Sequence, residues 1–303
     1  MNSASHPPAS AVSQRTLHLK GGRKGVLLFH GLSSSPLELQ FIARGLHRSG
    51  LTVKVPALDG YTYGTFGSSA TTTARSWVAS ALKELDHMLA ECESVAIGGL
   101  CLGSALALRV AGLRSDRLST LLCLSTSLDY DGWGNPWYTH LLPLARYVPF
   151  AKRISVKERE PFGLKDVRMR AWVARQMREA GESDAGAATL SVAELLKARD
   201  LIAMARSSLP EITVPTLLIH AKEDECSTPR SSYEIADRIS ANRIRVALLA
   251  DSYHMISIDR EKEHVLSEML QFLSHSDESN RTDANKERVQ VLSLFANRKD
   301  TEK

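Results

Sequence analysis

The chain alternates short, uninterrupted apolar runs with longer segments whose apolar residues recur every three or four positions. The run at 26–29 ends in His30-Gly31 and is typical of a strand buried on both faces of a sheet. A helical spacing follows Ser35-Pro36 and stops near Gly50. The same patterns predict strands at 51–55, 94–98, 118–124, 213–219 and 243–249, and helices at 74–92, 102–113 and 262–273. Such alternation predicts an α/β fold, a mostly parallel central sheet with helices on both faces.

The alternation stops between about Leu128 and Leu209, where polar, helix-prone segments replace it. We therefore expect a helical cap insertion in a single α/β core. The expected parts are a disordered leader (1–15), the core (16–127 and 210–274), the cap (128–209) and a polar tail (275–303). We expect the tail to be largely solvated, with one short amphipathic helix at 289–295 as the alternative.

The composition excludes several classes of protein. With 303 residues, 43% of them hydrophobic, the chain can bury its own core, which excludes intrinsic disorder and collagen-like structure. The net charge of +4 is too small to indicate a nucleic-acid partner. Four cysteines without a CxxC pair, and an N-terminus without a secretory signal, indicate a reducing compartment, so we expect a cytoplasmic protein. No apolar run is long enough to span a membrane.

One short motif carries the strongest chemical signal. Residues 99–103 read Gly-Leu-Cys-Leu-Gly, directly after a predicted buried strand and directly before a predicted helix. A turn this sharp strains its middle residue and requires small flanking residues. It also lifts Cys101 above the carboxyl edge of the sheet, where the N-terminus of the helix favours a thiolate. A lone cysteine is otherwise a small buried apolar residue, but this context favours a nucleophile, and no G-x-S-x-G occurs in the chain.

These features resemble the α/β-hydrolase superfamily, in particular small-capped bacterial carboxylesterases and monoacylglycerol-lipase-like enzymes, over about residues 24–274. The resemblance implies the α/β-hydrolase fold and acyl chemistry at Cys101. The chain departs from that branch at the nucleophile, because the branch carries serine where this chain has cysteine. A cysteine at this turn is similar to dienelactone hydrolase and the polyhydroxyalkanoate synthases.

The family's chain order of nucleophile, acid and histidine implies the other two members of a catalytic triad. The acid follows the strand after the insertion, where Asp224 is flanked by Glu223 and Glu225. The histidine lies in a short S-x-H loop before the last helix, which Ser-Tyr-His254 matches. A solvated acidic loop and a surface histidine are the alternatives. The resemblance thus implies a triad of Cys101, Asp224 and His254.

The turn His30-Gly31-Leu32 stands where the family carries its oxyanion turn. The resemblance implies that the backbone N–H groups of Leu32 and Leu102 bind the oxyanion that develops during acyl transfer. We expect His30 itself to be structural. No HExxH or other metal-ligand spacing occurs, so we expect neither a metal nor a cofactor.

The predicted cap is basic and aromatic. Residues 146–179 contain ten Lys or Arg against four Asp or Glu, a net charge of +6. In related folds such insertions cover the active site and shape an acyl pocket. We hypothesise that apolar faces of the cap line an acyl cavity while its basic face binds an anionic head group, CoA or an acyl carrier protein. An ordinary cap with a solvated basic face is the alternative.

Together these features predict an acyl hydrolase of the carboxylesterase or thioesterase type, which uses a Cys-His-Asp triad and forms a thioester acyl-enzyme. Its substrate is expected to be a small acyl ester or thioester. An acyltransferase that moves the acyl group from a thioester to an alcohol or amine would use the same residues. A binding protein without catalytic activity is the second alternative.

Overall fold

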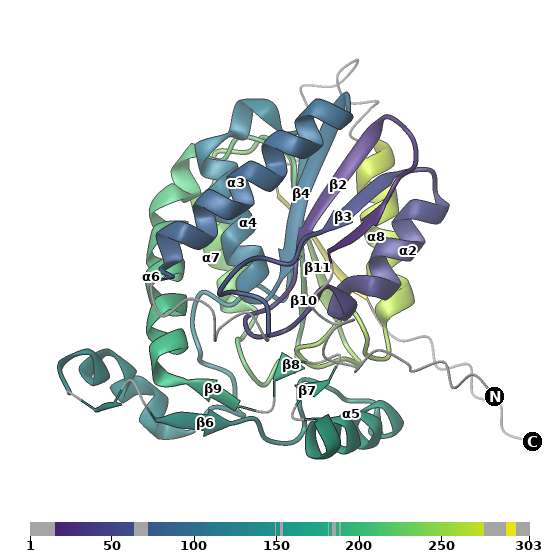
Figure 1. Ribbon diagram of the computed structural model, residues 1–303. Coiled ribbons are helices and arrows are strands. Elements are labelled where there is room, and N and C mark those ends of the chain that lie inside the picture. The colour runs from purple at the N-terminus through teal and green to yellow at the C-terminus, as the bar shows by residue number, and fades with distance from the viewer. Residues whose placement is uncertain are drawn as a thin grey trace, which may run out of the picture.

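The computed structural model describes residues 16–63, 72–148, 150–151, 154–180, 182–183, 186–187, 189–275 and 289–294. Its main sheet has eight strands in the order β1-β3-β2-β4-β5-β10-β11-β12 (Figure 1). The strands are β1 (Leu17–Leu19), β2 (Lys24–Phe29), β3 (Thr52–Val55), β4 (Ser94–Leu100), β5 (Thr120–Leu124), β10 (Thr216–Ala221), β11 (Ile244–Leu249) and β12 (Val289–Leu294). Strand β1 runs antiparallel to β3, and the other neighbouring pairs are parallel, as predicted.

Helices cover both faces of this sheet. They are α2 (Gln40–Arg48), α3 (Ala74–Glu91), α4 (Leu102–Leu113), α6 (Val192–Ser208), α7 (Arg230–Arg238) and α8 (Lys262–His275). Figure 1 shows α3, α4, α6 and α7 on one side and α2 and α8 on the other, and the buried residues form two clusters accordingly. The predicted α/β class is confirmed. None of the described helices is long and apolar enough to cross a membrane.

Strand β2 shows why an uninterrupted apolar run is needed at the centre of the sheet. Leu27 and Phe29 belong to the cluster under α3 and α4, whereas Val26 and Leu28 belong to the cluster under α2 and α8. Successive side chains of a strand point to opposite faces, and here each face is a packed core. The four side chains are therefore all buried.

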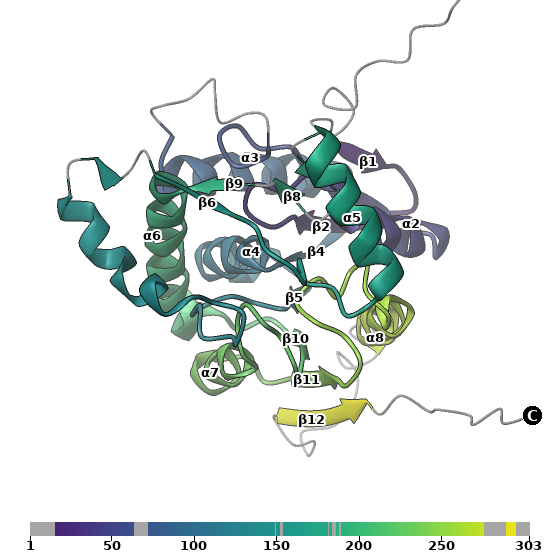
Figure 2. The ribbon, with the colours of Figure 1, turned by 90° about the horizontal axis from the view of Figure 1, so that it is seen from below.

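The insertion between β5 and β10 lies at the carboxyl ends of the parallel strands (Figures 1 and 2). It comprises η4 (Trp137–Tyr147), β6 (Ser155–Lys157), α5 (Val167–Ala180), β7 (Glu182–Ser183), β8 (Gly186–Ala187), β9 (Thr189–Ser191) and α6. The short antiparallel pairs β6–β9 and β7–β8 were not predicted. Helix α6 buries Ala198, Leu201 and Ala205 in the same cluster as α4, so the end of the insertion also extends the helical layer of the core.

The C-terminal segment differs from the prediction. A largely solvated tail, with a short helix at 289–295 as the alternative, was expected, but Val289–Leu294 forms β12 and pairs in parallel with β11 along its whole length. Apolar and polar residues alternate at 289–291, which suits a strand, and the edge of β11 supplies backbone partners that no local pattern reveals. The expected leader at 1–15 and the rest of the tail at 276–288 and 295–303 lie outside the described residues.

Candidate active site

Cys101 occupies a sharp turn between β4 and α4. Its backbone angles are φ 58° and ψ −120°, outside the regions that residues with a side chain usually adopt. A Cβ on Gly99 would overlap the backbone of Gly103, and a Cβ on Gly103 would overlap the carbonyl oxygens of Phe29 and His30. The two glycines of the motif are needed because the backbone here passes too close for any side chain.

The thiol of Cys101 is partly exposed and stands at the N-terminus of α4. Free N–H groups and the helix dipole at such a position stabilise negative charge. The N–H of Cys101 donates to the carbonyl of Leu124 at 3.0 Å, which fixes the turn against the end of β5. The Sγ atom lies 3.4 Å from Oγ of Ser127, a buried residue that the sequence analysis did not identify. Ser127 follows a predicted strand, but no local pattern distinguishes it from other polar residues in such positions.

Asp224 and His254 are in direct contact. The Nδ1–H of His254 donates to Oδ2 of Asp224 at 2.8 Å, and both side chains are buried. A carboxylate only accepts hydrogen bonds, so this contact fixes the tautomer with the proton on Nδ1. Burial is the largest single influence and lowers the pKa of His254. The negative charge and hydrogen bond of Asp224, together with negative charge on Cys226 and Cys101, outweigh burial and raise that pKa well above its ordinary value.

A second histidine supports Asp224. Nε2 of His220, on β10, donates to the carbonyl of Ser227 at 2.7 Å and lies 3.2 Å from Oδ2 of Asp224. The other carboxylate oxygen, Oδ1, accepts the N–H groups of Cys226 and Ser227 at 2.8 and 2.9 Å. Burial would raise the pKa of Asp224, but the charge of His254 and the hydrogen bond from His220 hold it below its ordinary value. Asp224 is therefore a fixed carboxylate, already oriented toward the imidazole.

The carboxylates on either side of Asp224 have different partners. Oε2 of Glu225 accepts the backbone N–H of His254 at 3.2 Å, and burial raises the pKa of this carboxyl. Glu223 is more exposed and pairs with Nζ of Lys165 at 3.0 Å. Of the three consecutive acids, Asp224 is thus the one that bonds the imidazole ring.

The contact between the thiol and the imidazole is not formed in the structure. Among the described residues, the buried Nε2 of His254 has no hydrogen-bond partner, and Sγ of Cys101 is directed at Ser127. The two groups lie close enough for negative charge on Cys101 to contribute to the raised pKa of His254. Rotation about the Cα–Cβ bond of Cys101 is the smallest motion that redirects the sulfur. Catalytic hydrogen bonds often tighten only when substrate binds.

The turn after β2 is held by its own histidine. The carbonyl of Gly31 accepts Nδ1–H of His30 at 2.7 Å and the N–H of Ser34 at 3.3 Å, while Nε2 of His30 lies 2.9 Å from the hydroxyl of Thr62. Burial lowers the pKa of His30 to about 4, so the ring is neutral at pH 7. Because a peptide group is planar and trans, fixing the Gly31 carbonyl also fixes the direction of the Leu32 N–H. His30 thus has the structural environment that was expected for it.

Glu38 is a second residue of the site that the sequence analysis missed. It lies on η1 (Pro36–Leu39), is 2% exposed, and its Oε2 accepts the N–H of Gly31 at 2.6 Å. A Cβ placed on Gly31 would lie 3.2 Å from Oε1 of Glu38 and 3.7 Å from Cβ of Cys101. The carboxyl and the thiol-bearing residue therefore flank the same side of Gly31. A glutamate between Leu37 and Leu39 in a predicted amphipathic segment was the available signal.

Two buried carboxylates shape the loop that carries His254. Glu261 accepts the N–H groups of Ala250 and Asp251, at 3.3 and 2.8 Å, and the hydroxyl of Ser252 at 2.8 Å. Asp259 accepts the N–H of Tyr253 at 2.8 Å. Charged acceptors make strong hydrogen bonds to backbone N–H groups. Consecutive residues before His254 are consequently fixed from the region just before α8.

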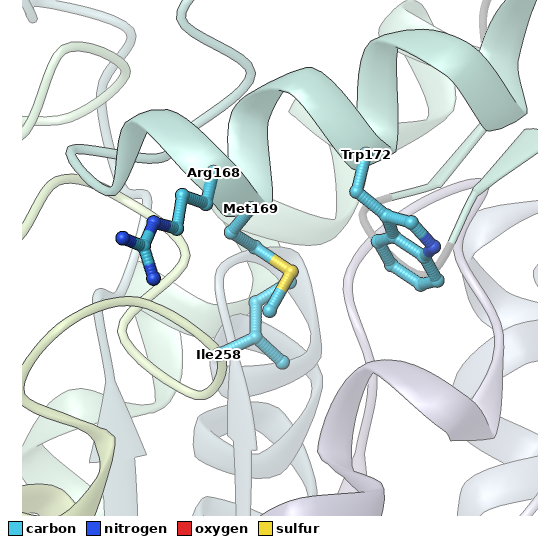
Figure 3. A pocket seen from close by; sticks show the side chains of 4 residues that line it. All are labelled: Arg168, Met169, Trp172 and Ile258. Atoms are coloured by element: carbon cyan, nitrogen blue, oxygen red, sulfur yellow. The ribbon is translucent and has the colours of Figure 1, made fainter.

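A pocket opens between the cap and this loop (Figure 3). It has a volume of about 390 Å³ and is lined by Arg168, Met169 and Trp172 of α5 and by Ile258. Figure 3 shows Met169 and Ile258 next to each other, with Arg168 on one side and Trp172 on the other. Met169 and Ile258 pack against the same apolar cluster that Cys101 contacts.

Comparison with known proteins identifies the family of this chain. Residues 22–261 match the family model Hydrolase_4, described as serine aminopeptidase, S33. A thermostable monoacylglycerol lipase of Bacillus sp. (strain H-257) is 24% identical over 258 residues, which cover 85% of this chain and 93% of the lipase. A carboxylesterase of Bacillus subtilis (strain 168) is 23% identical over 269 residues, which cover 88% of this chain and 98% of the esterase.

A solved structure gives the same result. A chain described with the metagenome-derived lipolytic enzymes LipS and LipT superposes with a TM-score of 0.74 at 25% identity, covering 87% of this chain and 98% of that chain. The matched family model extends from the start of β2 to beyond the loop of His254. The chain therefore belongs to the serine aminopeptidase S33 (Hydrolase_4) family of the α/β-hydrolase superfamily.

Proposed function

We propose that this protein is an acyl ester hydrolase that works through a thioester on Cys101. The observation that carries the proposal is the strained, partly exposed thiol at the N-terminus of α4, in the same site as the His254–Asp224 pair. Relatives that are lipases and esterases support ester hydrolysis in general. The cysteine nucleophile and its thioester are the specific part of the proposal.

In the first step, the thiol proton of Cys101 passes to Nε2 of His254, whose raised pKa favours the imidazolium–thiolate pair, and the sulfur attacks the ester carbonyl. The backbone N–H groups of Leu32 and Leu102 bind the negative oxygen of the tetrahedral intermediate, a role worth on the order of 3 kcal/mol per donor. When the intermediate collapses, the C–O bond breaks and His254 returns the proton to the leaving alcohol. Asp224 holds the imidazolium in place throughout.

In the second step, water attacks the thioester and gives up a proton to His254. The C–S bond then breaks, the carboxylic acid leaves, and the thiol is regenerated. If an alcohol or an amine replaces water in this step, the same residues perform acyl transfer. A thioester substrate could feed either outcome, because exchange of one thioester for another during acylation changes the free energy little.

The pocket beneath α5 is evidence that the part of the substrate nearest the cap is an acyl chain. Met169, Trp172 and Ile258 offer apolar walls, whereas Arg168 offers a positive charge at one side. An ester with an apolar chain and an anionic head group matches these walls. CoA and an acyl carrier protein are further candidates for the basic cap, and acyl-CoA is tested as a donor below.

The test is detection of the acyl-enzyme by intact mass. The protein is incubated with short-chain nitrophenyl esters and, separately, with acyl-CoA, and the adduct is mapped to a peptide. We expect one acyl group on Cys101 and no adduct in Cys101→Ala. Cys92→Ala is the matched control, because Cys92 is a buried free cysteine at the end of α3 and should leave acylation unchanged.

The alternatives give different results. An adduct that disappears only after an alcohol or amine is added indicates an acyltransferase. If neither ester nor thioester acylates the protein, and iodoacetamide labels Cys101 no faster than in denatured protein, the proposal is wrong and a binding protein is the better interpretation.

A further inference from the structure

Two buried side chains hold the peptide group between His30 and Gly31. The hydroxyl of Tyr61 donates to the carbonyl of His30 at 2.8 Å, and Oε2 of Glu38 accepts the N–H of Gly31 at 2.6 Å. The next peptide group is held through the Gly31 carbonyl and carries the Leu32 N–H. Glu38 is therefore part of the scaffold that orients the proposed oxyanion donor.

Glu38 differs from the other anchors because its charge can change inside the site. Burial raises the pKa of Glu38 to about 7, and the Gly31 hydrogen bond and the positive charge of His254 oppose that rise. The carboxyl is therefore neutral below about pH 7 and negative above it. Burial, together with the charges of Cys101 and Glu38, raises the pKa of Tyr61 well above its ordinary value, so the phenol stays neutral.

The groups that face this carboxyl come from four segments. Gly31 and the neutral His30 follow β2, Cys101 lies across Gly31 at the start of α4, Tyr61 follows β3, and His254 approaches from the last loop. Of these groups, Cys101 becomes negative and His254 positive during the proposed reaction. The charge of Glu38 therefore acts on both partners of the proton transfer.

We propose that Glu38 is a positioning residue of the oxyanion turn whose negative charge slows attack by Cys101, so that acylation is fastest when this carboxyl is neutral. The inference rests on the proposed function. Either form of the carboxyl can accept the Gly31 N–H, so ionisation changes the charge of the site and leaves its anchor in place. Ionised Glu38 opposes negative charge on Cys101, whose Cβ lies on the same side of Gly31, and His254 offsets part of this effect.

The variant Glu38→Gln isolates the charge. The amide keeps a carbonyl oxygen for the Gly31 N–H and cannot ionise. We expect the ratio of its kcat/KM to that of the unmodified protein to be near one at pH 5.5 and to rise to about tenfold above pH 8, the effect of one partly compensated charge. Glu263→Gln removes an exposed carboxyl on α8 and should keep a flat ratio. A flat ratio for Glu38→Gln, whether near one or uniformly lower, would overturn the proposal.

The variant Glu38→Ala separates the anchor from the charge. It removes both, so we expect ester acylation to be at least about tenfold slower than in Glu38→Gln at every pH, because the turn that carries the Leu32 N–H loses the anchor of its preceding peptide group. Equal acylation rates for the alanine and glutamine variants would show that the hydrogen bond to Gly31 does not position the oxyanion turn. Thermal unfolding of each variant establishes that the protein measured is folded.

A second measurement does not depend on turnover. The rate of Cys101 alkylation by iodoacetamide, followed site by site with mass spectrometry from pH 5.5 to 9, reports the thiolate directly. We expect the alkylation rate of Glu38→Gln to rise at lower pH than that of the unmodified protein. Superimposable plots of rate against pH would contradict the proposal. If no ester acylates Cys101, the proposed function fails, while this comparison still decides the effect of Glu38.

Discussion

Asp259 binds the backbone N–H of Lys165 at 2.8 Å through Oδ2, the same oxygen that binds the N–H of Tyr253. Its other oxygen accepts the N–H of Asp166 at 2.9 Å. Lys165 and Asp166 lead into α5 of the cap, whereas Tyr253 precedes the candidate catalytic histidine. One buried carboxylate thus ties the cap to the histidine loop, so a displacement of the start of α5 acts on the position of His254.

Replacing Asp259 tests this connection. Asp259→Ala leaves three partly buried N–H groups without their acceptor, and we expect the free energy of unfolding to fall by about 3 kcal/mol. Asp259→Asn keeps one acceptor oxygen and should lose less. Denaturant unfolding measures both, and an alanine variant within about 1 kcal/mol of the unmodified protein would show that the carboxylate is not needed to hold the two segments.

The glycines around Cys101 should differ sharply from other glycines in their tolerance of a side chain. Gly103→Ala drives a methyl group into the carbonyl oxygens of Phe29 and His30, and we expect it to cost at least about 4 kcal/mol. Gly50→Ala is the comparison, because Gly50 has φ +91° but open space around it, so only backbone strain of about 1–2 kcal/mol applies. Similar melting temperatures for the two variants would contradict the crowding seen at the turn.

The pair Asp224–His254 should stabilise the fold over a defined pH range. The lowered pKa of Asp224 means that its contribution is present above the unfolded value of about 4 and is lost as pH falls below it. The raised pKa of His254 means that its contribution is present below about pH 6.5 and is lost as pH rises through the folded value. Both contributions to the free energy of unfolding are fully present between about pH 4 and 6.5.

Asp224→Asn should therefore lose most stability inside that range, by about 3 kcal/mol, and less toward either end. It should also lower kcat by about four orders of magnitude, because the imidazole loses the partner that fixes its tautomer. Unfolding measured at several pH values tests the first expectation. A stability difference that does not change with pH would show that the charges of the pair are unimportant to folding.

Changing the nucleophile tests the chemistry directly. Cys101→Ser keeps a group that can attack from the same turn, so we expect weakened ester hydrolysis through an ordinary ester intermediate. Cys101→Ala removes the attacking atom, and its kcat/KM should fall by at least about 10³-fold. Full activity in the alanine variant would mean that another residue is the nucleophile.

The features that follow from local pattern were accessible to the sequence. Helix α4 begins and ends at the predicted residues, Leu102 and Leu113, and the glycines at 99 and 103 are explained by close contacts within and beside one turn. The buried strands were also predicted from local pattern. An uninterrupted apolar run such as Val26–Phe29 indicates a strand with a packed core on each face, and the structure places its residues alternately in the two clusters. The family's chain order of nucleophile, acid and histidine then led to Asp224 and His254. In the structure, Oδ2 of Asp224 lies 2.8 Å from Nδ1 of His254.

What the sequence did not reveal depends on segments that meet only in the folded chain. The contact of Ser127 with Cys101 joins residues 26 positions apart, and nothing near Ser127 distinguishes it from other polar residues after a strand. Glu38 has the pattern of an ordinary helical glutamate, and its partner, the N–H of Gly31, lies in the turn before that segment. The cap-to-loop role of Asp259 spans 94 positions. Long-range hydrogen bonds of this kind leave no periodic trace.

Strand β12 has a consequence for shortened forms of the protein. Ending the chain at His275 would remove the last strand and leave β11 as an open border, with a row of unpaired backbone groups beside apolar side chains such as Val246 and Leu248. Exposed borders of this kind adhere to one another and seed aggregates. The full chain also ends its sheet at an open strand, β12, but the shortened chain would expose a strand whose side chains belong to the core. We therefore expect light scattering on concentration to rise more for the shortened chain than for the full one.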